Sequence, residues 1–235
     1  MQPTSLFLLL VLLVSSQFVG CGESASVAEE PADRTFASST VYVKFPDAPS
    51  SMDAEEALFR LELAAPTYAG ERVVGIIEPK PGYDSSGKYS LAATYSSLAE
   101  FVSDMNSQDA KYVWESRAGS GYTLIFVYPA NGSYIDNTVG SMSVSNKTVC
   151  EALESITDSL DPSRPGHGAC VIRGGFRTVS NDEFASIREK KYSFATGSGA
   201  DGRDAVEALL SKVGTPIGFR IGSPFGKGRV HWVLR

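Results

Sequence analysis

The sequence contains few of the side chains that bind metal ions or activate nucleophiles, with two His and three Cys among 235 residues. This scarcity excludes a dense framework of metal sites. Positive charge is also scarce, because 21 Lys and Arg stand against 27 Asp and Glu; the net charge of −6 argues against general nucleic-acid binding. Long hydrophobic runs are missing as well: the run Leu6–Val14 falls well short of a membrane-spanning helix, which needs about 20 apolar residues.

The short run at the front is typical of an export signal. Leu6–Val14 is followed by Ser15, Ser16 and Gln17 rather than by more apolar residues. A secretory signal has an apolar centre of roughly 7–15 residues and then small residues near the cleavage site. We therefore expect residues 1–20 to be a signal peptide and the protein to be exported.

The segment after this run resembles a bacterial lipobox, in which small residues precede a Cys that is lipidated. It reads Phe18-Val19-Gly20-Cys21, with Gly20 in a favourable position and Phe18 where Leu is usual. The resemblance implies a lipid on Cys21 that holds the protein at a membrane of the cell envelope without spanning it. The alternative is a signal cleaved after Ser26 or Ala28, which would discard Cys21.

Residues 21–39 form the next distinct segment. They are rich in Ser, Ala, Glu and Pro and contain almost no large apolar side chain. Such a segment buries too little surface to offset the entropy of ordering it. We interpret it as a disordered tether whose span is on the order of 20–25 Å.

The remaining chain, with an ordinary globular composition, predicts an α+β fold with mixed or antiparallel sheets, divided into module regions 40–140 and 141–235. The spacing of β-branched, aromatic and apolar residues predicts that a strand, helix, strand, strand order recurs along it. The predicted strands are 41–43, 73–78, 112–115, 122–128, 142–144, 170–173, 192–194, 218–222 and 229–234. The predicted helices are 97–106, 147–160 with Asn146 as N-cap, 181–190 and 205–213.

The last repeat carries a resemblance to a family. The helix 204–213, followed by Gly214 and the strand residues 217–221, resembles the short N-terminal module of secretins and TonB-dependent proteins. Residues 149–156 and 98–114 are weaker versions of the same pattern. The resemblance covers 73–235 and implies a small α+β interaction module outside the cytoplasm, with no catalytic residues to transfer.

Two cysteines remain after Cys21. Cys150 begins a predicted helix and Cys170 lies in the strand after it, a separation that a helix packed on its own sheet could bridge. Because an exported pair is more often oxidised than free, we expect a disulfide between them. The alternative is a pair of buried thiols.

Basic residues concentrate at the C-terminal end, where no Asp or Glu follows Glu207. They suggest an anionic-partner patch, and the alternative is ordinary charge on an outer face. The residues are Lys212, Arg220, Lys227, Arg229 and Arg235. Two predicted strands carry a set of aromatic residues that could form a second binding surface, but we assign this set to the core. It comprises Tyr112, Trp114, Tyr122, Phe126 and Tyr128.

No catalytic, metal or cofactor motif emerges. His167 and His231 are far apart, and the Gly-rich stretches 119–121, 197–199 and 222–228 match neither a nucleophile elbow nor a phosphate loop. The leading hypothesis is a lipid-anchored, non-enzymatic module that binds an envelope protein or an anionic envelope component. The alternative is an envelope hydrolase or sugar-processing enzyme with a site assembled from remote residues, and a third is a purely structural lipoprotein. The oligomeric state is not indicated.

Overall fold

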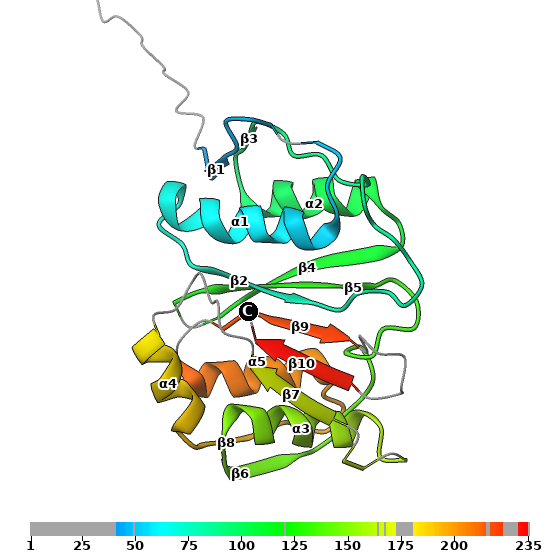
Figure 1. Cartoon of the computed structure of the whole chain (residues 1–235), viewed down its shortest axis with the longest axis vertical. Helices are drawn as coiled ribbons and strands as arrows, with labels where there is room; N and C mark the ends of the chain where they lie inside the picture. Colours follow the sequence, from blue (N-terminus) through cyan, green and yellow to red (C-terminus); the bar gives the residue numbers. More distant parts are fainter. Residues whose placement is uncertain are drawn as a thin grey trace, which may run out of the picture. The chain divides into compact units, whose positions relative to one another are not determined.

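A mixed six-stranded sheet runs through the middle of the computed structural model, in the order β4-β5-β2-β9-β10-β7 (Figure 1). The structure describes residues 41–48, 50–119, 121–163, 165–166, 168–172, 181–214, 217–222 and 230–234. The predicted signal peptide, Cys21 and the tether lie outside these ranges.

The elements fall into two groups in chain order. The first group is β1 (Val43–Lys44), α1 (Ala54–Tyr68), β2 (Val73–Ile77), β3 (Thr94–Tyr95), α2 (Leu98–Gln108), β4 (Tyr112–Ala118) and β5 (Thr123–Pro129). The second is β6 (Ser143–Lys147), α3 (Val149–Leu160), β7 (Gly168–Ile172), α4 (Asn181–Glu189), β8 (Tyr192–Ala195), α5 (Gly202–Val213), β9 (Phe219–Gly222) and β10 (Val230–Leu234).

The two groups repeat one pattern of strand pairing. In the first, β4 is antiparallel to β5 and β5 is parallel to β2; in the second, β9 is antiparallel to β10 and β10 is parallel to β7. The remaining strands form two antiparallel ribbons, β1-β3 and β6-β8. Apart from α4, which has no counterpart, the second group therefore repeats the first element by element, and we call the groups the first and second halves.

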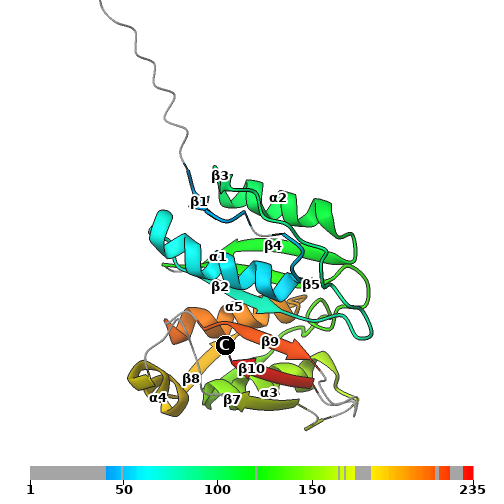
Figure 2. The same cartoon turned by 45° about the horizontal axis from the view of Figure 1, so that its top comes forward.

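The halves meet where β2 pairs in parallel with β9, through Ile76 opposite Phe219 and Ile77 opposite Arg220. Because β9 corresponds to β4, which runs antiparallel to β2, the strands of the second half run in reversed directions. The helices change faces in step: α1 and α2 cover one face of the first half's strands, and α3 and α5 pack on the opposite face (Figures 1 and 2). A half-turn about an axis across the strands, with a shift along it, relates the two halves.

The α+β class with mixed and antiparallel sheets is confirmed. The predicted strand, helix, strand, strand order is present in β8-α5-β9-β10, whereas in the first half the strand directly before α2 is the two-residue β3, which the sequence did not predict, and not 73–78. The predicted regions 40–140 and 141–235 contain β1 to β5 and β6 to β10, which share the central sheet. The assignment of the aromatic set to the core is also confirmed, since all five side chains are buried.

One helix is missing from the prediction, and one predicted N-cap needs correction. The missing helix is 54–68, which Asp53 caps by accepting from the Glu56 N–H at 2.7 Å. The N-cap of α3 is Thr148 rather than Asn146, because Thr148 and Glu151 form a reciprocal capping box while β6 continues through Lys147. No described helix has the length and hydropathy to span a membrane.

A disulfide joins α3 to the strand that follows it. The sulfurs of Cys150 and Cys170 lie 2.07 Å apart, with their Cα atoms separated by 5.1 Å. Gly168 in the same strand approaches α3 closely, since a Cβ added there would lie 2.9 Å from Thr157 Cβ. The bridge therefore fastens a helix to an edge strand of the sheet at a close contact.

We expect the double substitution Cys150→Ser and Cys170→Ser to lower the free energy of unfolding. A bridge that spans 20 residues in sequence should stabilise by about 3 kcal/mol, because it limits the unfolded chain. Urea unfolding of the wild type and the variant, each with and without reductant, measures the difference. Reductant should weaken only the wild type; equal stability of both proteins without reductant contradicts the prediction.

Candidate functional site

A surface pocket of about 470 Å³ opens between the β8–α5 connection and the first turns of α5. The connection contributes small residues and hydroxyls, and α5 contributes two carboxylates. The lining residues are Ala195, Thr196, Gly197, Ser198, Gly199, Ala200, Asp204, Glu207, Ala208 and Ser211.

The start of α5 is fixed in place by local contacts. Asp201 and Asp204 form a capping box, in which each side chain accepts a hydrogen bond from the other residue's backbone N–H. Gly202 lies so close to the loop before β6 that an added Cβ would lie 2.6 Å from the carbonyl oxygen of Ile135. The pocket is therefore built on a capped helix whose first residue is held against the loop between the halves.

A group of ion pairs, which we call the arginine cluster, lies beside the pocket. Its two guanidinium groups come from β4 and α5, and its five carboxylates come from β4, α5 and the loops before β6 and α5. The members are Glu115, Arg117, Asp136, Asp201, Arg203, Asp204 and Glu207.

Arg117 links the cluster to the pocket. Its Nη1 lies 2.7 Å from Asp204 Oδ1 and 3.3 Å from Glu207 Oε2, and its Nε lies 2.7 Å from Glu115 Oε1. Its guanidinium stands over the ring of Phe126, 5.4 Å from the centroid. One arginine thus bonds to both carboxylates that line the pocket.

Arg203 is more deeply placed, with its side chain 14% exposed. Its guanidinium contacts Asp201, lies 2.6 Å from Asp136 and 2.9 Å from Glu115, and stands over the ring of Tyr128. Two arginines therefore face five carboxylates in the described residues, which leaves this surface with an excess of negative charge.

The charges around Asp204 favour its ionised form. Burial alone would raise the pKa of Asp204. The hydrogen bond from the Asp201 backbone and the Arg117 guanidinium together lower the pKa by more than burial raises it, so the pKa of Asp204 lies below its ordinary value. A carboxylate held in this way suits the binding of a cationic group better than the donation of a proton.

The predicted anionic-partner patch is not assembled by the described residues. Lys227, Arg229 and Arg235 lie outside the described ranges, as does His167. Lys212 is in the last turn of α5, whereas Arg220 lies on the opposite face of the sheet, 3.4 Å from Glu55 of α1. The two described members therefore do not share a surface.

Sequence reasoning missed the arginine cluster. One signal was available: Glu115 and Arg117 lie on the face of β4 opposite to that of the buried Tyr112 and Trp114, and both are only partly exposed. Their partners on α5 are up to 90 positions away in sequence, so only the fold brings them together.

No family model, curated protein or solved structure that was compared with the chain matches it. The site therefore has to be interpreted from its own residues. Within the described ranges, no group of three His, Cys, Asp or Glu residues is placed to hold a metal ion.

Outside the arginine cluster, the acidic residue Glu78 is buried directly after β2 and is 6% exposed. Its carboxylate accepts hydrogen bonds from the backbone N–H of Tyr134 at 2.7 Å, from that of Ile135 at 3.0 Å and from the Ser133 hydroxyl at 2.9 Å. These donors lie in the loop between the halves. Glu78 therefore ties that loop to the central sheet.

Burial raises the pKa of Glu78 above its ordinary value, and the three hydrogen bonds lower it without cancelling the effect of burial. The folded protein therefore binds this proton more tightly than the unfolded chain does. We expect the Glu78 contribution to stability to be present at low pH and to be lost as pH rises from about 4.5 through the raised pKa.

Urea unfolding between pH 4 and pH 7 measures this contribution as the difference between the wild type and Glu78→Gln. The advantage of the wild type should shrink with rising pH, while the exposed control Glu189→Gln should follow the wild type. A difference that stays constant, or that grows with pH, contradicts the raised pKa.

Proposed function

We propose that the chain is an exported, lipid-anchored protein of the bacterial cell envelope that binds another envelope protein without catalysing a reaction. Two sequence features support the location: the short apolar run Leu6–Val14 and the lipobox-like segment that ends at Cys21. The resemblance of 204–221 to the short secretin and TonB module supports an interaction role.

The observation that carries the binding role is the bonding of Arg117 to both pocket carboxylates. A glycoside hydrolase of the common two-carboxylate type needs one carboxylic acid that keeps its proton, with a raised pKa. Asp204 has a lowered pKa instead, and Glu207 shares the same guanidinium nitrogen. The pair therefore supports recognition of charge more than acid–base catalysis, which makes the hydrolase the less supported alternative.

The charge of the site supports a partner that presents a basic side chain. The pocket is lined by Asp204 and Glu207, and the adjoining cluster has more carboxylates than guanidinium groups. A Lys or Arg of the partner would find two carboxylates, three hydroxyls and small residues that leave room for the apolar part of its side chain. The anionic envelope component, suggested by the C-terminal basic residues, is the second candidate partner.

The anchor is tested by the intact mass of the full chain expressed in a bacterial host. We expect the membrane fraction to contain a chain that begins at Cys21 and carries a diacylglycerol and an amide-linked acyl group. The variant Cys21→Ala should lack this mass and leave the membrane fraction. An unlipidated wild type contradicts the anchor but leaves the binding site untouched.

The binding site is tested by titrating the exported protein with a labelled lysine-rich peptide and with a glutamate-rich peptide of equal length. We expect the lysine-rich peptide alone to bind, with an affinity that falls as salt is added. Glu207→Gln should weaken binding about two- to fivefold, since one exposed ion pair contributes up to about 1 kcal/mol. Glu189→Gln, an exposed carboxylate of α4, is the matched control.

Equal binding of the two peptides, or equal affinities for Glu207→Gln and Glu189→Gln, would remove the pocket as a recognition site. Preference for the glutamate-rich peptide would favour the anionic component instead.

A further inference from the structure

The two outer strands of the central sheet correspond to the two strands that meet at its centre. By the repeat, β7 in the second half corresponds to β2, and β4 in the first half corresponds to β9. Among the described strands, β7 pairs only with β10 and β4 only with β5. The β7 edge of one copy therefore matches the β4 edge of a second copy in the way that β2 matches β9 within the chain.

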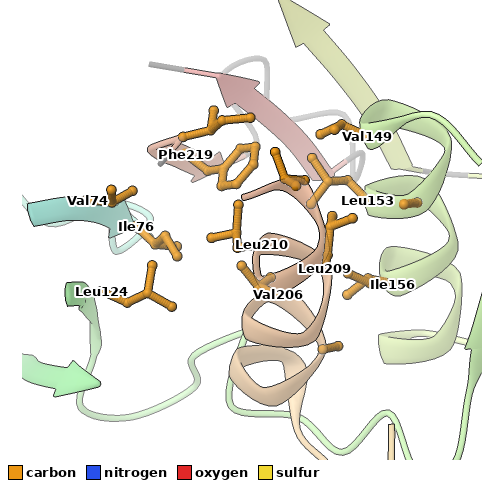
Figure 3. Close-up of a cluster of buried hydrophobic side chains, with 14 of the residues drawn as sticks. Val74, Ile76, Leu124, Val149, Leu153, Ile156, Val206, Leu209, Leu210 and Phe219 are labelled. Atoms are coloured by element: carbon orange, nitrogen blue, oxygen red, sulfur yellow. The ribbon is translucent and has the colours of Figure 1, made fainter. Parts of the chain in front are cut away.

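At the central junction, α5 covers more than its own strand. Leu210 stands nine residues after the N-cap Asp201 and lies with Val74 and Ile76 of β2 in one buried cluster (Figure 3). The helix that follows β8 thus reaches over the neighbouring strand of the other half. This apolar contact accompanies the parallel pairing of β2 with β9.

At the outer edge, the same helix position holds a different residue. Asn106 of α2 stands nine residues after the N-cap Ser97, and no described strand lies beside β4 for it to cover. Its carboxamide bonds instead to the backbone of Trp114: Oδ1 accepts from the Trp114 N–H at 2.8 Å, and Nδ2 donates to the Trp114 carbonyl at 2.9 Å.

Trp114 is the counterpart of Phe219, the first residue at which β9 pairs with β2. Trp114 lies opposite Val127, which pairs with the last residue of β2, and Phe219 lies opposite Leu234, which pairs with the last residue of β7. Asn106 therefore makes, at this residue, the two hydrogen bonds that an added strand would make.

We propose that Asn106 is an edge cap that prevents β4 from pairing with β7 of a second copy of this chain. In the register of the central junction, such a pairing places Val171 opposite Trp114 and Ile172 opposite Glu115. Because each copy would use one edge and leave the other free, the association is head-to-tail and does not close. The cap therefore prevents copies of this chain, whose two sheet edges match, from adding to one another without limit.

Removal of the cap tests the proposal. We expect Asn106→Ala to self-associate weakly and Asn106→Leu strongly, because Leu restores the residue found at the corresponding position, Leu210. Sedimentation of the full exported chain, in one detergent for all variants, should show the mass of Asn106→Leu rising about twofold or more with concentration, as open-ended addition requires. The wild type should keep a constant mass.

Two further variants show whether the association uses the proposed edge. Ser103→Leu adds the same apolar side chain at another exposed position of α2, and it should behave as the wild type. Ser116 is two residues beyond Trp114, so its N–H also points away from β5, and a proline there blocks strand addition without removing a β4–β5 hydrogen bond. Asn106→Leu with Ser116→Pro should therefore return to the mass of the wild type.

Self-association of Ser103→Leu to the same degree, or of the double variant, would overturn the proposal, as would a constant mass for both Asn106 variants. Amide hydrogen exchange on the wild type tests the cap without relying on a variant. The Trp114 amide should exchange about fivefold or more slowly than that of Ser116, which corresponds to a hydrogen-bond contribution of about 1 kcal/mol. Equal exchange at the two amides would also overturn it.

Discussion

Strand β2 is buried on both of its faces, and the two covers come from different halves of the chain. Val73 and Ile77 pack with α1 and α2, while Val74 and Ile76 pack with α3 and α5. Such a strand needs apolar residues at successive positions instead of alternating ones. The helices of the two halves therefore lie on opposite faces of the sheet. The helices α3 and α5 of the second half cover the face of β2 that α1 and α2 leave open.

Where a strand in this fold lacks a neighbour, a side chain takes its place. Asn106 does so at the β4 edge, and Glu62 does so on β2, where its Oε1 accepts from the Gly75 N–H at 2.6 Å, just before the pairing with β9 begins at Ile76. A buried backbone N–H or C=O group without a hydrogen-bond partner is costly, so where strand pairing ends in a buried position a side chain has to provide the missing hydrogen bond. Glu78 satisfies the loop between the halves by the same means. The buried carboxylates of Glu62 and Glu78 thus mark places where regular strand pairing stops.

Much of this architecture could be predicted from periodicity, and the missing part has physical reasons. The stripes of α2, α3 and α5 consist of large apolar residues and were found, whereas the buried face of α1 includes Ala54, Ala57 and Ala65, which do not stand out from an exposed face. The repeat was seen only as its shorter strand, helix, strand, strand part, because the missing helix hid the longer unit. The arginine cluster depends on contacts between β4 and α5, so the local pattern of β4 shows two charged residues but does not identify their partners.

The cover that α5 provides also affects how the chain reaches its native state. Synthesis proceeds from the N-terminus, so β2 and β5 are made long before α5, whose last residue is Val213. Until then Val74, Ile76, Leu124 and Phe126 lack the layer that buries them in the finished protein. The nascent first half would therefore expose an apolar sheet face that is prone to aggregation, and protection of this face by chaperones during synthesis would be a condition of a good yield of folded protein.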